Sequence, residues 1–174
     1  MKIVRRGDIF TLLTGADNIG IELGVAAGQM SGFAINSGKF KRFIGVDMYT
    51  DRHHSIKQYK QNLRAGYNPL TSNNIILRMK FDEAVDLFPK HSFDFIYVDG
   101  YAHTGEEDGK TYDQWWSKLK PGGLFAGDDY DPEWPLVVKY ADAFVAKHNL
   151  DFKITEIRET TGQGAFPTWY AFKP

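Results

Sequence analysis

The stretch GDDYDPEW, residues 127–134, places Asp128 and Asp129 directly after an apolar run at residues 124–126. Asp99 follows another apolar run, FDFIYV at residues 93–98. If both runs are neighbouring parallel strands, the three carboxylates meet at one edge of a sheet, and their mutual repulsion calls for a cation. Oxygen ligands without thiols favour Mg²⁺, Mn²⁺ or Ca²⁺ over zinc. The alternative is that Asp128 and Asp129 are solvated loop residues, since aspartate is frequent in turns.

Short apolar runs alternate with longer segments of helical period along most of the chain. The expected strands are residues 18–24, 42–47, 74–79, 93–100 and 122–128. Strand, helix and strand in repetition predict a parallel sheet with right-handed crossovers. Residues 152–159 and 168–174 alternate like half-exposed strands and predict an antiparallel hairpin. We therefore expect one domain, residues 1–174, with an α/β, doubly wound and mostly parallel sheet.

Two helix starts are predicted from capping signals. Residues 104–107, Thr-Gly-Glu-Glu, have the spacing of a capping box. Asp131 followed by Pro132 has the pattern of an N-cap and a first-turn proline, before the apolar stripe at residues 137–145. His53 and His54 have no carboxylate pattern around them, and we interpret them as the solvated start of a helix.

The first glycine-rich turn, IELGVAAGQMSG at residues 21–32, is where a ligand would approach the backbone. Gly24 and Gly28 suit a tight strand-to-helix turn, but the dinucleotide fingerprint would need a glycine where Ala26 stands. Glu22 would repel a pyrophosphate and attract a cationic ligand such as S-adenosylmethionine, which carries an ammonium and a sulfonium. Asp47, at the end of the second strand, can accept both ribose hydroxyls of either cofactor.

Four further residues are placed near the nucleoside by their position alone. Met48 follows Asp47, while Met79, Lys80 and Phe81 follow the third expected strand and would flank an adenine. The alternative for the glycine turn is a tight connection that binds no ligand.

The motifs IELGVAAGQMSG, FIGVDMY, FDFIYVDG and LKPGGLFAGDDY occur in an order and spacing that resemble class I S-adenosylmethionine-dependent methyltransferases. The resemblance covers nearly the whole chain, from about residue 18 onward. It is closest to the small-molecule O-methyltransferases that bind a divalent metal, of the catechol and macrolide-sugar types. It implies a seven-stranded sheet whose last strand is antiparallel, S-adenosylmethionine as cofactor, and a hydroxyl of a small molecule as methyl acceptor.

The resemblance also implies roles for the acidic cluster. Asp99, Asp128 and Asp129 match the ligands of a divalent metal, expected to be Mg²⁺, which binds two neighbouring substrate oxygens and orients a hydroxyl in line with the methyl group. Asp99 would therefore also be catalytic and lie at the cofactor. His103 is the candidate base, although relatives often have DGxH and this loop is one residue longer. The catechol type uses a lysine in this loop, and here none precedes Lys110.

Composition limits the partners. The formal net charge of −1 gives no electrostatic footprint for nucleic acid or an anionic membrane. The absence of cysteine excludes disulfides and is compatible with a reducing compartment. No signal peptide or membrane span is recognisable, so we expect a cytoplasmic protein, and the short N-terminal segment leaves room for a homo-oligomer that completes the acceptor pocket. Three other functions stay open: a non-catalytic nucleoside-binding domain, an NAD-dependent oxidoreductase, and a methyltransferase acting on nucleic acid or protein.

Overall fold

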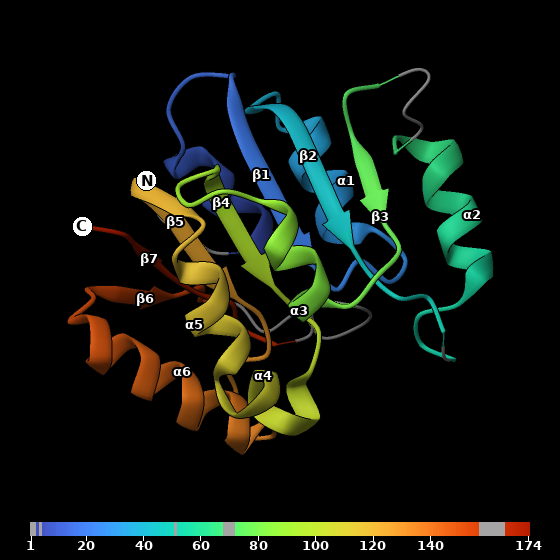
Figure 1. Ribbon diagram of the computed structural model, residues 1–174. Helices are drawn as coiled ribbons and strands as arrows, with labels where there is room; N and C mark the ends of the chain where they lie inside the picture. Colours follow the sequence, from blue (N-terminus) through green and yellow to red (C-terminus); the bar gives the residue numbers. More distant parts are fainter. Residues whose placement is uncertain (1–2, 4, 51, 68–71, 157–165) are drawn as a thin grey trace.

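A single seven-stranded sheet forms the centre of the computed structural model, which describes residues 3, 5–50, 52–67, 72–156 and 166–174 (Figure 1). The strand order is β3-β2-β1-β4-β5-β7-β6, and β7 runs antiparallel to both of its neighbours. This confirms the predicted fold class and all five predicted parallel strands. The strands are β1 Asn18–Leu23, β2 Phe40–Val46, β3 Ile75–Leu77, β4 Phe93–Val98, β5 Leu119–Gly127, β6 Phe152–Ile154 and β7 Trp169–Phe172.

The predicted C-terminal hairpin is confirmed as an antiparallel pair, with Phe152 of β6 opposite Ala171 of β7. It is β7 that borders the parallel part of the sheet, because Ala171 also lies opposite Phe125 of β5. Residues 157–159 of the predicted strand, and residues 160–165 of the connection, lie outside the described residues. The strand β6 ends at Ile154, earlier than the sequence pattern predicts.

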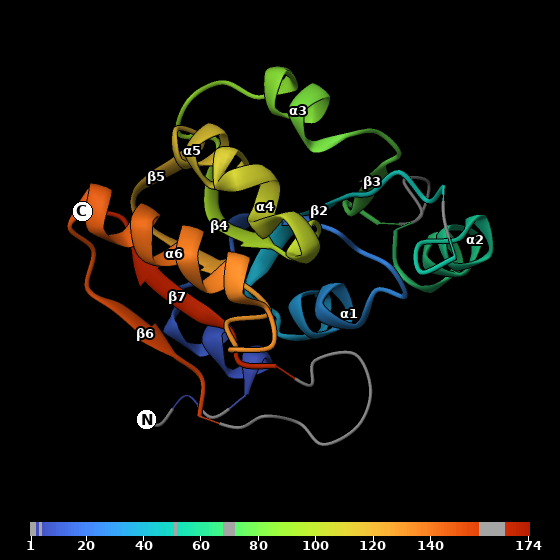
Figure 2. The same ribbon diagram turned by 90° about the horizontal axis from the view of Figure 1, so that it is seen from below.

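Helices cover both faces of the sheet (Figure 2). Their apolar residues join the strands in two core clusters, one containing Met30 of α1 and the other containing Trp115 of α5 and Phe144 of α6. No helix in the described ranges is long and apolar enough to cross a membrane. The helical elements are η1 Arg6–Leu12, α1 Gln29–Asn36, α2 Ile56–Ala65, α3 Phe81–Ala84, η2 Val85–Leu87, η3 Ala102–Thr104, α4 Gly105–Asp108, α5 Lys110–Trp116 and α6 Pro135–His148.

The central strand β4 is apolar without interruption from Phe95 to Val98. Phe95 and Tyr97 belong to the core on one face, while Ile96 and Val98 belong to the core on the other. All four side chains are almost fully excluded from solvent. A parallel strand buried on both faces has no polar side to display, which is the pattern the sequence shows.

The N-terminal segment folds into the 3₁₀ helix η1, which packs on the sheet. Ile9 and Phe10 are buried, and the ring of Phe10 meets those of Phe40 and Phe95 edge-on, with centroid distances of 5.4 and 5.2 Å. This packing fixes the residues at the start of η1 relative to the strand ends. One of these residues, Arg6, matters for the site described below.

Both predicted helix starts need correction. The Thr104 hydroxyl does accept a hydrogen bond from the backbone N–H of Glu107, as in a capping box. The residues from Gly105 to Gly109 nevertheless all have positive φ angles, so this segment is a left-handed turn, and the right-handed helix begins at Lys110.

The helix after β5 begins at Pro135 rather than at Pro132. The carboxylate of Asp131 accepts a hydrogen bond from the N–H of Glu133 and closes a turn before the helix. A proline at the first helical position is present in either case, and the sequence offers two candidates three residues apart.

Candidate functional site

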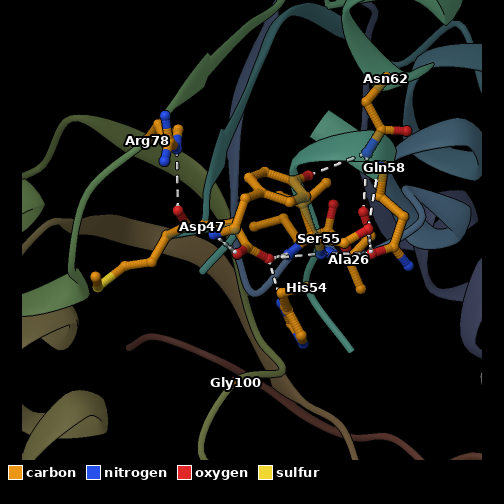
Figure 3. Close-up of polar contacts among 12 residues, drawn as sticks. Ala26, Asp47, His54, Ser55, Gln58, Asn62, Arg78 and Gly100 are labelled. Atoms are coloured by element: carbon orange, nitrogen blue, oxygen red, sulfur yellow. Dashed lines mark hydrogen bonds and ion pairs between the residues drawn. The ribbon is translucent and has the colours of Figure 1, made fainter. Parts of the chain in front are cut away.

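The carboxylate of Asp47, at the end of β2, binds the first glycine-rich turn. Its Oδ2 atom accepts hydrogen bonds from the backbone N–H groups of Val25 and Ala26, at 2.9 and 3.0 Å, and its Oδ1 atom accepts one from Tyr49 at 2.9 Å (Figure 3). Burial alone would raise the pKa of Asp47, but the hydrogen bonds from His54 and from the turn lower it below its ordinary value. Asp47 is therefore an ionised acceptor next to the turn.

His54 also contacts Asp47, a contact that the sequence interpretation missed. Its ring nitrogen Nδ1 forms a hydrogen-bonded pair with Asp47 Oδ2 (Figure 3). Ser55, the next residue, caps α2 through a reciprocal pair of hydrogen bonds with Gln58. This cap fixes the position of His54 directly before the helix. The interpretation of His54 as a solvated helix start is wrong. The sequence did contain a signal for the contact between Asp47 and His54, because these two residues flank one short loop.

The glycine turn is shaped by the close approach of two loops. Gly24 has φ of +92°, and a Cβ atom at this position would lie 1.6 Å from the carbonyl oxygen of Asp99. Gly28 also has a positive φ, and a Cβ there would meet the side chain of Asn62 at 2.5 Å. The first turn and the loop after β4 can therefore lie side by side only with glycine at position 24.

Glu22 lies just before this turn and is almost completely buried, with 1% of its surface exposed. Its carboxylate accepts a hydrogen bond from the Ser31 hydroxyl, which in turn accepts one from Tyr67. Burial raises the pKa of Glu22 to about 8, although the Ser31 hydrogen bond and the Arg6 guanidinium oppose the rise. The group is poised to lose its proton when a positive charge arrives.

The predicted meeting of carboxylates at the ends of β4 and β5 is found. Asp99, Asp128 and Asp129 line one cavity of about 460 Å³ together with Glu22 and Gly24. Burial, and next the neighbouring Asp128 carboxylate, raise the pKa of Asp99 well above its ordinary value and that of Asp129 to about 7. We call this space the acidic cavity.

The cation beside these carboxylates is Arg6 of η1. Its Nη1 atom lies 3.0 Å from Oδ2 of Asp128 and 3.9 Å from Oδ2 of Asp99. Its Nη2 atom donates to the side chain of Gln29 at the start of α1. Sequence reasoning missed Arg6, since the pattern MKIVRR near an N-terminus reads as solvated charge.

The predicted metal site does not fit this arrangement. One oxygen of Asp128 is bound by Arg6, and the other accepts a hydrogen bond of 2.9 Å from the Thr168 hydroxyl. Within the described ranges, no group of three or more histidine, cysteine, aspartate or glutamate side chains is placed so that it could hold a metal ion. A divalent ion on Asp128 would also face the guanidinium.

A second cavity, of about 300 Å³, adjoins the first. Asp47, Met48, Tyr49, Phe81 and Tyr101 line it. His54 lines both cavities, so the two spaces adjoin at this histidine, whose ring contacts the Asp47 carboxylate. We call this space the aromatic cavity; its aromatic lining and its carboxylate are features that suit a nucleoside.

Of the four residues placed near the nucleoside by position alone, two lie at the aromatic cavity. Met48 and Phe81 line it. Met79 packs against the core instead, and Lys80 is exposed at the start of α3 and faces a different hollow. The predicted roles of Met79 and Lys80 therefore find no support in this arrangement.

His103, the candidate base, is placed in η3 at the rim of the aromatic cavity. Its ring packs edge-on against Trp134, with a centroid distance of 4.9 Å. Trp134 and Phe166, whose rings are 5.9 Å apart, form a wall of the acidic cavity. His103 is thus adjacent to both spaces, although it lines only the aromatic one.

The comparison with protein families gives one match: a family described as "Methyltransferase domain" matches residues 19–130. These residues include nearly all of β1, all of β2 to β5 and the lining of the aromatic cavity, whereas Arg6, Trp134 and Phe166 of the acidic cavity lie outside the match. A comparison with curated proteins found no match.

Several solved structures share the fold. A spermidine synthase from Thermotoga maritima is 18% identical with a TM-score of 0.69, covering 98% of this chain and 58% of its own. A SAM-dependent O-methyltransferase from Thermotoga maritima is 16% identical with a TM-score of 0.68, covering 99% and 67%. An O-methyltransferase from Bacillus cereus in complex with SAH is 14% identical with a TM-score of 0.68, covering 97% and 80%.

The chain spans about 58% of the spermidine synthase's length, and at these identities the likeness shows the fold alone. The family match spans well over half of the chain and contains Glu22, Gly24, Asp47, Asp99 and Asp128. The chain belongs to this family of methyltransferase domains.

Proposed function

We propose that this protein transfers a methyl group from S-adenosylmethionine to a hydroxyl group of a small molecule. The observation that carries the proposal is the place of Asp47, whose ionised carboxylate is held by the glycine turn, lines the aromatic cavity and contacts His54, the residue that this cavity shares with the acidic cavity. S-adenosylmethionine is a nucleoside joined to a cationic amino acid, so its nucleoside suits the aromatic cavity and its cationic part suits the acidic cavity.

The aromatic cavity suits the nucleoside part. Tyr101, which is partly exposed, and Phe81, whose ring lies 4.8 Å from that of Tyr101, supply aromatic surface for a base. Both oxygens of Asp47 already accept hydrogen bonds, so a ribose hydroxyl would reach this carboxylate by replacing His54, its side-chain partner. These features are common to many adenine nucleotides, so the choice among them depends on the acidic cavity.

The acidic cavity favours a cationic ligand over a pyrophosphate. Glu22 and Asp99 face the space beside the glycine turn, where a dinucleotide would place its phosphates. S-adenosylmethionine, when bound, supplies an electrophilic methyl group on a positively charged sulfonium. Carboxylates at this position stabilise the ligand's positive charge, which supports this cofactor against NAD.

The chain's own residues then position the acceptor and move its proton. Asp99 is proposed to accept a hydrogen bond from the acceptor hydroxyl at the end of β4, which holds the oxygen on the methyl side of the site. His103, which lines the aromatic cavity and packs against Trp134 of the acidic cavity, is proposed to take the hydroxyl proton. No step is assigned to a divalent metal, because the cluster as arranged does not fit one.

The first test is calorimetric titration of the purified protein with S-adenosylmethionine, S-adenosylhomocysteine and NAD. We expect the first two to bind and NAD not to bind. Asp47→Ala should weaken binding at least about tenfold, since a hydrogen bond to a charged acceptor contributes about 1.5–3 kcal/mol. Asp142→Ala, which changes an exposed aspartate on α6 that pairs with Tyr130, is the matched control.

The second test is methyl transfer itself. The protein and cofactor are incubated with catechols, diols and mono-alcohols, and products carrying one added methyl group are sought by mass spectrometry. The His103→Gln variant should still bind the cofactor and lose turnover. Failure of the wild-type protein to bind S-adenosylmethionine would overturn the proposal, and NAD binding would favour an oxidoreductase.

A further inference from the structure

The acidic cluster contains a guanidinium where the sequence predicts a metal ion, and the contacts of Arg6 indicate what this group does. Arg6 has only 7% of its surface exposed, which is unusual for an arginine and requires that its charge be compensated. The compensation comes mainly from Asp128, whose Oδ2 lies 3.0 Å from Nη1, while Asp99 Oδ2 lies 3.9 Å away; the two residues lie 122 and 93 positions further along the chain. Such a pair exists only in the folded protein.

The fold holds Arg6 at this place by means that are independent of the charges. The apolar side chains of η1, Ile9 and Phe10, are buried against the sheet directly after Arg6. Gln29, at the start of α1, accepts a hydrogen bond from Nη2 and so orients the plane of the guanidinium. Arg6 is thus fixed at both its backbone and its head group.

Both oxygens of the Asp128 carboxylate already have hydrogen-bond partners. Asp128 accepts from Arg6 at one oxygen and from Thr168 at the other. The side chain of Asp128 is 5% exposed, so water cannot easily replace either partner. A divalent ion could bind there only by displacing a buried cation, because both positive charges would compete for one carboxylate.

We propose that Arg6 is the built-in cation of this site: it holds Asp99 and Asp128 in position, and the protein has no divalent-metal requirement. Arg6 acts as a positioning residue, because its contacts are with the carboxylates. The consequence for catalysis rests on the proposed methyl transfer. The consequence for metal binding does not, and it can be tested alone.

The test is a titration of the metal-stripped full chain with Mn²⁺, followed by electron paramagnetic resonance of the free ion. We expect the wild-type protein to bind no stoichiometric Mn²⁺ with a dissociation constant below about 1 mM, the weak end of biological oxygen-ligand sites. Arg6→Met keeps a long side chain and removes the charge, so it should create a Mn²⁺ site. Adding Asp128→Asn to Arg6→Met should abolish that site.

Arg6→Lys is the matched control, because it retains the positive charge and should bind no Mn²⁺. Circular dichroism checks that each variant is folded. Stoichiometric Mn²⁺ binding by the wild-type protein that disappears in Asp128→Asn would overturn the inference, and this arm does not depend on the folding of any Arg6 variant.

Failure of this inference can be told apart from failure of the proposed function. Calorimetry with S-adenosylmethionine on the same samples reports the cofactor, whereas the Mn²⁺ titration reports the cation site. If a methyl acceptor is found, turnover by the wild-type protein should be unchanged in excess EDTA. Loss of turnover in EDTA that Mg²⁺ restores would overturn the inference and leave the methyl transfer in place.

Discussion

Glu22 should make the affinity for S-adenosylmethionine depend on pH. In the free protein, burial raises the pKa of Glu22 to about 8, so the group is mostly protonated at neutral pH. A cationic ligand in the acidic cavity favours the ionised form and lowers this pKa, so binding releases a proton. Affinity therefore rises as the pH rises toward about 8 and then levels off.

The size of the effect follows from the pKa. Each pH unit below about 8 reduces the ionised fraction about tenfold, so binding at about pH 6 should be roughly one hundred times weaker than at about pH 9. Glu22→Gln keeps the shape and cannot ionise. The affinity of this variant for S-adenosylmethionine should be low and almost independent of pH. Any pH dependence that remains comes from the ligand or from other titratable groups.

The assay is calorimetry across this pH range at constant ionic strength, in buffers of different ionisation enthalpy. The wild-type protein should release close to one proton per ligand near neutral pH, and Glu22→Gln should release much less. Equal slopes and equal proton release in the two proteins would refute the assignment of Glu22 to the cationic part of the ligand.

Three further predictions concern the loops around the site. Burial raises the pKa of Glu106 from its ordinary 4.5 to about 7, so the folded protein loses stability as the pH rises from about 4.5 through about 7. Glu106→Gln should therefore raise stability at about pH 9 by up to about 3 kcal/mol in thermal unfolding, and exposed Glu107→Gln should not. His54→Ala frees the carboxylate at the end of β2, so it should tighten cofactor binding by roughly fivefold in calorimetry, and weaker binding would show that the histidine contacts the ligand. Gly24→Ala places a Cβ atom against a backbone carbonyl and should destabilise the protein by at least about 3 kcal/mol in urea unfolding, whereas Gly32→Ala has open space and should be tolerated.

The sheet could be predicted from the sequence because each of its central strands has a local signal. Where β4 is buried on both faces, from Phe95 to Val98, its sequence is apolar, and the first polar residue, Asp99, follows the strand where the chain reaches the ligand edge. The proximity of Asp99 and Asp128 could also be predicted, since the neighbouring parallel strands β4 and β5 end at the same edge of the sheet. Helix boundaries were less accurate, because Pro132 and Pro135 are both acceptable first-turn residues.

The partners of the site residues could not be predicted in the same way. Arg6 meets Asp128 across 122 residues, and nothing local to either position indicates the pair. His54 lies seven residues from Asp47, but only the capped start of α2 turns its ring toward the carboxylate. A sequence shows which charges exist, and the packing of η1 and α2 decides which of them meet.

The identity of the cation also bears on which acceptors should be tried. A divalent metal selects acceptors that offer it two neighbouring oxygens, as catechols do. A guanidinium that is already bound by Asp128 and Gln29 imposes no such requirement, so a single hydroxyl can suffice. Selection would then depend on the wall formed by Trp134 and Phe166 at the acidic cavity. Mono-alcohols with an apolar ring should therefore be turned over at least as well as matched catechols, and a strict preference for catechols would argue against Arg6 as the cation of the site.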